Sequence, residues 1–250
     1  MIPYGKQSID ETDIQAVIEV LRSDYLTQGP KVAEFEAVFA AKVGSTYAVA
    51  VNSGTAALHG CMIALGIGSG DEIIVPPITF TASANCVLFV GGKPVFADVT
   101  PSGHIDPEQI EAKITKQTKA VIAVDYAGWP CDYERILALC KQHEIPLICD
   151  ACHALGATWN GRLVGSIGLL NNFSFHPVKH IATGEGGMVT TNDAELAEKI
   201  REFRTHGITK DAAKFKGLVS KLPDDQLSPP PRRLTLRGRP LALRDAQPRI

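Results

Sequence analysis

The sequence lacks the features that mark membrane, secreted and nucleic-acid-binding proteins. No uninterrupted apolar run is long enough to cross a bilayer, and the polar start MIPYGKQSIDE contains no apolar signal-peptide core. The formal net charge is only −2, which gives no electrostatic argument for a nucleic acid or an anionic membrane as a partner. These absences predict a cytoplasmic protein with neither kind of partner.

Metal-binding and redox motifs are also scarce. Of the six cysteines, only Cys149 and Cys152 form a C-x-x-C pair, and no second such pair accompanies them. Reduced and mostly buried thiols are therefore expected, and no metal site is predicted. His59, His104 and His143 stand alone in the sequence, so we expect them at surface or helix positions rather than as metal ligands.

What the sequence does contain is a regular succession of short apolar runs and helical segments. With 45% hydrophobic residues, the chain can build a sizeable core. Buried strands are predicted at residues 47–51, 72–75, 94–97, 120–124, 146–149, 173–175 and 188–191. Helices are predicted at residues 55–65, 81–89, 107–114, 132–143 and 193–206. Strands this apolar are covered on both faces, so the pattern predicts an α/β fold with a mostly parallel sheet flanked by helices.

Two further helices are predicted before the first strand. Ser8 and Glu11 have the spacing of a capping box and begin an amphipathic helix whose apolar face includes Val17. The next helix is predicted from Pro30 to the residue before Gly44, because proline suits the first turn of a helix and glycine suits its end.

The end of the sequence has a different composition. Residues 221–250 hold six Pro, six Arg and six Leu but no aromatic residue. We therefore predict a domain at residues 1–216 and a biased, disordered tail at residues 217–250. A genuine basic tail and a translation product that left its reading frame both fit this composition, and the abrupt change favours the second.

Sheets of this kind bind ligands at the carboxyl ends of their strands, where four clusters of polar residues occur. The first is Ser53, Gly54 and Thr55, after strand 47–51 and at the start of a helix. Free backbone N–H groups and the helix dipole make such a position an anion site. Taken alone, this cluster is more typical of an ordinary helix cap.

The second and third clusters would suit a flat, charged cofactor. Phe80 follows strand 72–75 and could stack on an aromatic ring, although a core position is the more common role of a phenylalanine. Asp150 ends strand 146–149, where a buried carboxylate is costly unless it meets a cation such as a protonated pyridine nitrogen. His153 lies three residues further on and could reach an oxygen of the same ring. The alternative role of Asp150 is to cap a following helix.

The fourth cluster contains a lysine in a glycine-rich loop. Strand 173–175 delivers Ser174 and then Lys179, and the segment TGEGG follows. A lysine that is shielded from water near a cationic centre becomes a nucleophilic amine. Together with Asp150 and the upstream anion loop, Lys179 predicts a site for pyridoxal 5′-phosphate. A dehydrogenase is a weaker alternative, because no G-x-G-x-x-G follows the first predicted strand.

Over residues 1 to about 213 the sequence resembles the DegT/DnrJ/StrS family of pyridoxal-phosphate sugar aminotransferases. The similarity is carried by LTQGPKVAEFE, NSGTAALH, PPITFTASANC, DACHALGA, RTHGITKD and, most specifically, FSFHPVK followed by TGEGGM. Within the family it is most similar to the pseudaminic acid type, which aminates the C4 ketone of a UDP-linked keto-deoxy sugar with L-glutamate as donor. The resemblance implies the large domain of a fold-type I, aspartate-aminotransferase-like enzyme.

The resemblance also implies roles for individual residues. Lys179 would hold the cofactor as a Schiff base and carry a proton in catalysis, and Asp150 would keep the pyridine nitrogen protonated. Phe80 would stack on the ring and His153 would bond its 3-hydroxyl. The phosphate would be held by Ser174, together with Gly54 and Thr55 of the anion loop.

The sequence departs from the family pattern after the matched region. A G-Y-N-Y-R-type segment and a small C-terminal domain, both present in the family, are not found. The resemblance implies a homodimer, whereas these missing parts argue against dimerisation and turnover by this chain. The alternative to an active aminotransferase is therefore a shortened, catalytically incompetent relative that at most binds the cofactor.

Overall fold

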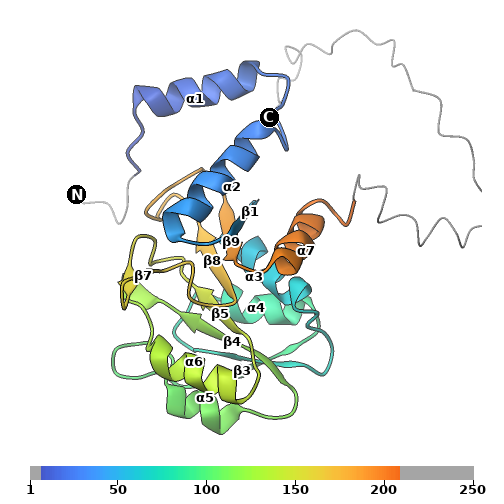
Figure 1. Ribbon diagram of the computed structural model, residues 1–250, viewed down its shortest axis with the longest axis vertical. Coiled ribbons are helices and arrows are strands. Elements are labelled where there is room, and N and C mark those ends of the chain that lie inside the picture. Colours follow the sequence, from blue (N-terminus) through green and yellow to red (C-terminus); the bar gives the residue numbers. More distant parts are fainter. Residues whose placement is uncertain (1–6, 209–250) are drawn as a thin grey trace, which may run out of the picture. The chain divides into compact units, whose positions relative to one another are not determined.

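The computed structural model describes residues 7–208 of the chain, and Figure 1 shows their arrangement. The predicted tail at residues 217–250 lies outside the described residues. The helices are α1 (Glu11–Arg22), α2 (Pro30–Val43), α3 (Gly54–Ala64), α4 (Ala82–Phe89), α5 (Pro107–Lys113), α6 (Tyr133–Gln142) and α7 (Ala194–Arg204). The strands are β1 (Tyr47–Val51), β2 (Glu72–Val75), β3 (Lys93–Phe96), β4 (Thr118–Val124), β5 (Leu147–Asp150), β6 (Thr158–Trp159), β7 (Arg162–Leu163), β8 (Leu170–Ser174) and β9 (Gly187–Thr191).

The main sheet has seven strands in the order β1-β9-β8-β5-β4-β2-β3. Four neighbouring pairs are parallel, namely β2–β3, β2–β4, β4–β5 and β5–β8. Strand β9 runs antiparallel to both of its neighbours, β1 and β8. The expected mostly parallel sheet is therefore confirmed, and the reversed β9 and the small hairpin of β6 and β7 are additions that the sequence did not reveal.

Helices cover both faces of this sheet, as the apolar strands predicted. Alternate residues of a strand point to opposite faces, so Val121 and Ile122 of β4 belong to different clusters of buried side chains. One cluster contains residues of α2, α5 and α6, and the other contains residues of α3, α4 and α7. Both cores are continuous across the strands, which explains why the strand sequences read as unbroken apolar runs.

Helix α1 has a cap different from the predicted one. Asp10, rather than Ser8, caps the helix, and its carboxylate accepts from the N–H groups of Thr12 and Asp13. The capping box is completed by the Asp13 side chain, which accepts from the Asp10 N–H. Asp10 lies directly before the first helical residue and offers a carboxylate, a capping group as good as the serine hydroxyl. No residue of α1 is buried, so its predicted apolar face lies uncovered.

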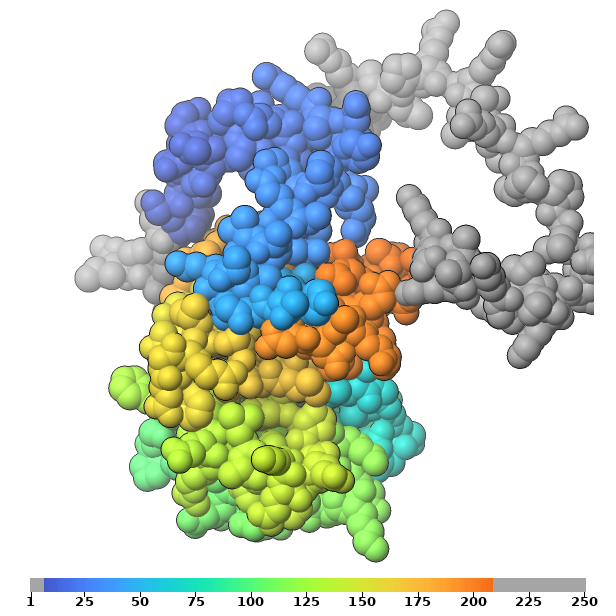
Figure 2. Space-filling view, in the orientation of Figure 1, coloured from blue at the N-terminus to red at the C-terminus, as the bar shows by residue number. Residues whose placement is uncertain are grey.

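The outer edge of β1 is closed by an ion pair. Glu36 of α2 accepts from the N–H of Ala50, and Arg204 of α7 donates to the carbonyl oxygen of the same residue. The two side chains also pair with each other and are largely buried. Figure 2 shows the orange residues of α7 against the blue segment of α2 and β1. Because free edge groups invite pairing with another strand, this ion pair protects the edge while it joins two helices distant in the sequence.

Candidate active site

The strand register brings the predicted clusters to one edge of the sheet. Gly187, the first residue of β9, pairs with both Val51 of β1 and Ser174 of β8. Since β9 is antiparallel to both strands, the carboxyl ends of β1 and β8 meet beside it. In the neighbouring strands, Asp150 lies level with Val124 of β4 and with Asn172 of β8. The structure thus places the anion loop, Ser174 and Asp150 along the same edge.

Close packing holds the anion loop in position. A Cβ atom on Gly54 would lie 2.9 Å from Cβ of Ser174, and one on Gly187 would lie 2.3 Å from the carbonyl oxygen of Ser53. Only glycine allows the backbone to approach this closely. Ser53 does cap α3, since its Oγ accepts from the Ala56 N–H at 3.1 Å. Capping uses an oxygen lone pair of Ser53, and its hydroxyl donates to Asn52 Oδ1 at the long distance of 3.4 Å.

Asp150 is buried and surrounded by hydrogen-bond donors. Ser83 Oγ donates to Asp150 Oδ2 at 3.0 Å, and Asn172 Nδ2 donates to Oδ1 at 3.1 Å. The N–H of Cys152 also donates to Oδ1, at 3.3 Å. No helix follows β5, so the alternative role of Asp150 as a helix cap is wrong. A carboxylate with three donors and a side chain only 5% exposed is fixed in direction.

Lys179 lies in the loop between β8 and β9. The loop is closed at its base by two hydrogen bonds, from the Phe175 N–H to the Gly186 carbonyl and from the Thr183 N–H to the Phe175 carbonyl. The Lys179 N–H donates to the His176 carbonyl at 2.8 Å, which makes a turn at the lysine. Lys179 is half-buried, so it is neither a core residue nor a fully solvated surface residue.

Lys179 and Asp150 act on the same two side chains. Burial lowers the pKa of His153, the positive charges of Lys179 and His180 lower it further, and the Asp150 carboxylate opposes them. Burial also raises the pKa of the Cys152 thiol well above its usual value, with Asp150 adding to the rise and Lys179 opposing it. The amine and the carboxylate therefore lie within electrostatic reach of one small group of residues at this edge.

Phe80 is not a core residue. The residue is 73% exposed, so a core position, the more common role for a phenylalanine, is wrong here. The residue lies just before α4, and its carbonyl oxygen accepts from the N–H of Ser83, the residue that holds Asp150. The backbone of Phe80 is thus held three residues before a hydrogen-bond donor to Asp150, and its side chain is left exposed.

Known proteins resemble this chain over the region that builds the site. The sequence profile of the DegT/DnrJ/EryC1/StrS aminotransferase family matches residues 7–223. The chain belongs to this family.

Individual relatives agree with this assignment. The spore coat polysaccharide biosynthesis protein SpsC of Bacillus subtilis is 48% identical over 212 residues, which are 84% of this chain and 54% of SpsC. Helicobacter pylori PseC, an aminotransferase involved in the biosynthesis of pseudaminic acid, is 41% identical, with a TM-score of 0.79 over 84% of this chain and 57% of PseC. The PLP-form of the sugar aminotransferase Spr1654 from Streptococcus pneumoniae is 34% identical, with a TM-score of 0.81 over 84% of this chain and 59% of Spr1654.

These likenesses confirm the predicted fold-type I aminotransferase fold. The chain spans about half the length of SpsC. The family's matched region contains every residue predicted for the site, from Ser53 to Lys179.

Several residues of this family member's site were not predicted from the sequence. Ser83, Asn172 and Asp125 are fully buried and polar, and all three lie at or beside Asp150. Asn172 Oδ1 and Asp125 Oδ2 have no hydrogen-bond partner within the described part of the chain. A polar residue inside an apolar strand, as in LLNNFSF, is the pattern that could have indicated Asn172.

Asp125 is a second buried carboxyl group beside Asp150. Its N–H donates to the Asp150 carbonyl at 3.0 Å, and its Oδ1 accepts from the Cys131 N–H at 3.0 Å and the Tyr133 hydroxyl at 2.7 Å. Burial raises the pKa of Asp125 to about 6, although these two hydrogen bonds lower it, and the charge of Asp150 raises it. Two negative charges so close together in a buried place repel each other.

The remaining expectations concern caps, cysteines and histidines. Asp132 caps α6 and Asp193 caps α7, each at the first residue of the range predicted for its helix. All six cysteines are free, and five are buried. His104 is neither on the surface nor in a helix, because its ring is buried and lies 2.9 Å from the Trp129 carbonyl. Among the described residues, no group of three or more His, Cys, Asp or Glu could hold a metal ion, and no helix could span a membrane.

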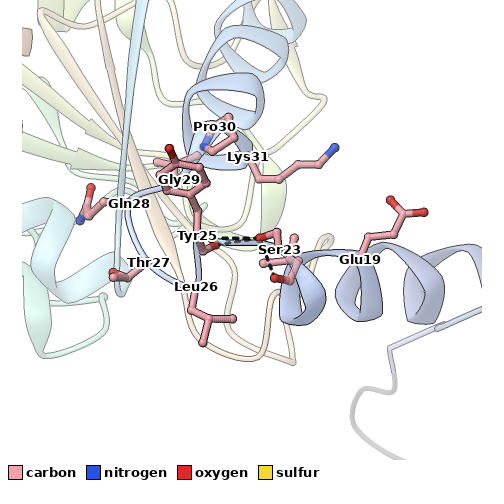
Figure 3. Close-up of a pocket in the computed structure, with 11 residues that line it drawn as sticks. Glu19, Ser23, Tyr25, Leu26, Thr27, Gln28, Gly29, Pro30 and Lys31 are labelled. Atoms are coloured by element: carbon pink, nitrogen blue, oxygen red, sulfur yellow. Dashed lines mark hydrogen bonds between the residues drawn. The ribbon is translucent and has the colours of Figure 1, made fainter. Parts of the chain in front are cut away.

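A hollow of about 300 Å³ lies away from these residues, where α1 joins α2. Figure 3 shows Tyr25, Thr27 and Gln28 in the connection between the two helices. The residues that line the hollow all fall between 19 and 32, so none of the predicted site residues is among them. This hollow therefore belongs to the helix joint and not to the site at the strand ends.

Proposed function

We propose that this chain forms the cofactor site of a pyridoxal-phosphate-dependent aminotransferase that moves the amino group of L-glutamate to the C4 ketone of a UDP-linked keto-deoxy sugar. The family supports an aminotransferase of sugars, and the 41% identity to PseC supports a sugar of the pseudaminic acid type. A nucleotide sugar and glutamate are metabolites of the cytoplasm, which supports that location for the protein.

The residues at the sheet edge fit pyridoxal phosphate, first at its phosphate. Gly54 and Gly187 bring the start of α3 against Ser174, at a distance that leaves no space for a side chain at either glycine. The first N–H groups of a helix have no partner within it, and the helix dipole attracts an anion. Ser53, Gly54, Thr55 and Ser174 would therefore bind the phosphate by backbone and hydroxyl donors.

Asp150 fits the pyridine nitrogen of the cofactor. Its three donors stabilise a carboxylate, and a buried carboxylate is favoured by a positive partner such as a protonated ring nitrogen. Asp150 would keep the ring nitrogen protonated. When bound, pyridoxal phosphate supplies an electron sink next to the reacting carbon.

Lys179 and His153 fit two different roles toward the cofactor, Lys179 as a base and His153 as a hydrogen-bond partner. Lys179 would hold the cofactor through Nζ and then move a proton to and from the substrate carbon at Nζ. Burial of His153 and then the charge of Lys179 lower the pKa of its imidazole, which favours the neutral ring at neutral pH. A neutral ring can bond the 3-hydroxyl of the cofactor, and Phe80 would stack on the cofactor's face.

One observation carries the proposal: Asp150 and Lys179, which are 29 positions apart in the sequence, both act on Cys152 and His153. A carboxylate for the ring nitrogen and an amine for the reacting carbon must lie around a single ring. Their shared neighbours support an arrangement of the two around a single small volume.

The cofactor proposal is tested by reduction of the purified chain with borohydride after addition of pyridoxal phosphate. We expect the phosphopyridoxyl group on Lys179, located by peptide mass spectrometry, and none in Lys179→Ala. Lys199→Ala, which removes an exposed lysine of α7, is the matched control and should label like the parent. Labelling spread over several surface lysines, or unchanged in Lys179→Ala, would contradict the proposed site.

Turnover is a separate measurement. Glutamate should convert the bound cofactor to its amine form, and the keto sugar should then reverse the change. Labelling at Lys179 with no reaction toward glutamate would favour the alternative, a relative that binds the cofactor without turning over.

We also propose a homodimer. The uncovered apolar face of α1, which includes Ile14, Val17 and Leu21, supports an association that buries it. Sedimentation velocity should show a dimer, and Val17→Asp should shift it toward the monomer. A parent chain that sediments as a monomer at every concentration would contradict this.

A further inference from the structure

The segment after β4 is an unusual, rigid turn. Ala127 has φ +54° and Gly128 has φ +85°, so two consecutive residues adopt left-handed backbone conformations. The turn is tied at both ends to Asp125, whose carbonyl accepts from the Gly128 N–H and whose Oδ1 accepts from the Cys131 N–H. A buried carboxylate thus holds a backbone conformation that an alanine rarely adopts.

This turn packs directly against the proposed cofactor site. A Cβ atom on Gly128 would lie 2.9 Å from the His153 carbonyl oxygen, so the two backbones touch. The Tyr126 ring lies 6.5 Å from the His153 ring, centroid to centroid. Tyr126 also packs against Gly103, where a Cβ atom would lie 3.1 Å from Tyr126 Cδ1. The ring of Tyr126 is therefore fixed next to a residue of the site.

The turn also exposes large aromatic surfaces at this edge. Tyr126 is 41% exposed and Trp129 is 73% exposed. The backbone of Trp129 is held in place by its hydrogen bond with the buried His104. A rigid backbone that presents uncovered rings is typical of a ligand-binding surface, because binding then orders little that is not ordered already.

We propose that residues 125–129 form the sugar-facing wall of the site and that Tyr126 contacts the sugar ring of the nucleotide-linked substrate. The inference rests on the proposed function, since it assigns the substrate to the face that Tyr126 and His153 share. A sugar ring presents C–H groups on its faces and hydroxyl groups at its rim. A tyrosine matches both, because its ring offers an apolar face and its hydroxyl can donate or accept.

The turn itself does not depend on the Tyr126 side chain. It is closed by backbone groups and by the carboxylate of Asp125, to which Tyr133 also donates. Tyr126 can therefore be replaced without removing any hydrogen bond that ties the turn to Asp125. This separation makes a direct test of substrate contact possible.

Binding of UDP-N-acetylglucosamine, a stable sugar nucleotide without the ketone, tests the proposal on the full chain with pyridoxal phosphate present. In a Trp159→Phe background, Trp129 is the only tryptophan, so its fluorescence and its quenching by acrylamide report on the wall itself. We expect the probe to bind and to protect Trp129 from acrylamide. Tyr126→Ala should weaken binding by about fivefold or more, the size expected for loss of one aromatic contact.

Phe96→Ala is the matched control, because Phe96 is an aromatic residue of the edge strand β3 that is 51% exposed. It should leave probe binding unchanged. Tyr126→Phe keeps the ring and should lose less affinity than Tyr126→Ala. No binding by the parent, equal affinity of Tyr126→Ala and the parent, or equal losses in Tyr126→Ala and Phe96→Ala would each overturn the proposal.

The test distinguishes this inference from the proposed function. Borohydride labelling of Lys179 reports on the cofactor and should be the same in Tyr126→Ala and the parent. Failure of labelling with a Tyr126-dependent affinity for the probe would reject the aminotransferase and retain the sugar-binding wall. Normal labelling of Lys179 with no effect of Tyr126→Ala on probe binding would retain the aminotransferase and reject the sugar-binding wall.

Discussion

The buried carboxyl group of Asp125 should make the stability of this chain depend on pH in a defined direction. Its pKa is raised from 3.8 to about 6, chiefly by burial. Because the folded state holds this proton more tightly than the unfolded state, the stabilisation is complete below the unfolded pKa and is lost as the pH rises through about 6. A rise of the pKa from 3.8 to about 6 corresponds to a loss of about 3 kcal/mol in the free energy of unfolding.

Asp125→Asn removes the ionisable group and keeps an oxygen for the donors from Cys131 and Tyr133. Replacing Oδ2 by an amide group without a partner destabilises the variant by the same amount at every pH. The informative quantity is therefore how the difference in unfolding free energy between Asp125→Asn and the parent changes with pH. Between about pH 4 and about pH 7.5, the stability of the variant should rise relative to the parent by about 2 kcal/mol. Urea unfolding followed by the fluorescence of Trp159, which packs on Tyr133, measures it.

A second variant checks the cause. Tyr133→Phe removes a hydrogen bond that lowers the pKa of Asp125. In this variant, the pH range over which stability is lost should therefore lie higher than in the parent. Stability curves of Asp125→Asn and the parent that run parallel over this range would refute the reasoning. If the parent became more stable relative to Asp125→Asn as the pH rises, the predicted direction of the pH dependence would be wrong.

Two further predictions concern the packing that positions the site. Gly187→Ala forces a Cβ atom to 2.3 Å from the Ser53 carbonyl and should cost about 2 kcal/mol or more and weaken uptake of pyridoxal phosphate. Gly68→Ala, where nothing lies within 4 Å, is the control, and equal thermal stability of the two variants would contradict the argument. Glu36→Gln leaves the charge of Arg204 largely buried and unpaired and should lower the free energy of unfolding by about 2 to 3 kcal/mol in urea titrations. Glu34→Gln breaks only an exposed pair with Lys31 and should cost less than about 1 kcal/mol, so similar losses would reject a special role for Glu36.

Much of the secondary structure followed from local patterns. The bounds of β1, β2 and α2 agree with the predicted ones, because apolar runs, Pro30 and Gly44 act within a few residues. The sequence pattern predicts Ser8 as the cap of α1, whereas Asp10 is the cap, since two acceptors of similar quality lie two positions apart. The antiparallel direction of β9 was not predicted. The direction of a strand in a sheet depends on the path of the connections and is not encoded in the sequence of a five-residue strand.

The candidate site likewise has features that local sequence predicts and features that depend on the tertiary structure. The sequence by itself determined that an anion loop, a strand-end carboxylate and a lysine loop occur in this order, because each is a short motif with its own chemistry. Only the tertiary structure decided that Ser83 and Asn172 hold Asp150, that Phe80 is uncovered and that the Asp125 turn lies against His153. These contacts join residues from different strands and helices, and their distances are set by sheet register and helix packing, which no local pattern encodes.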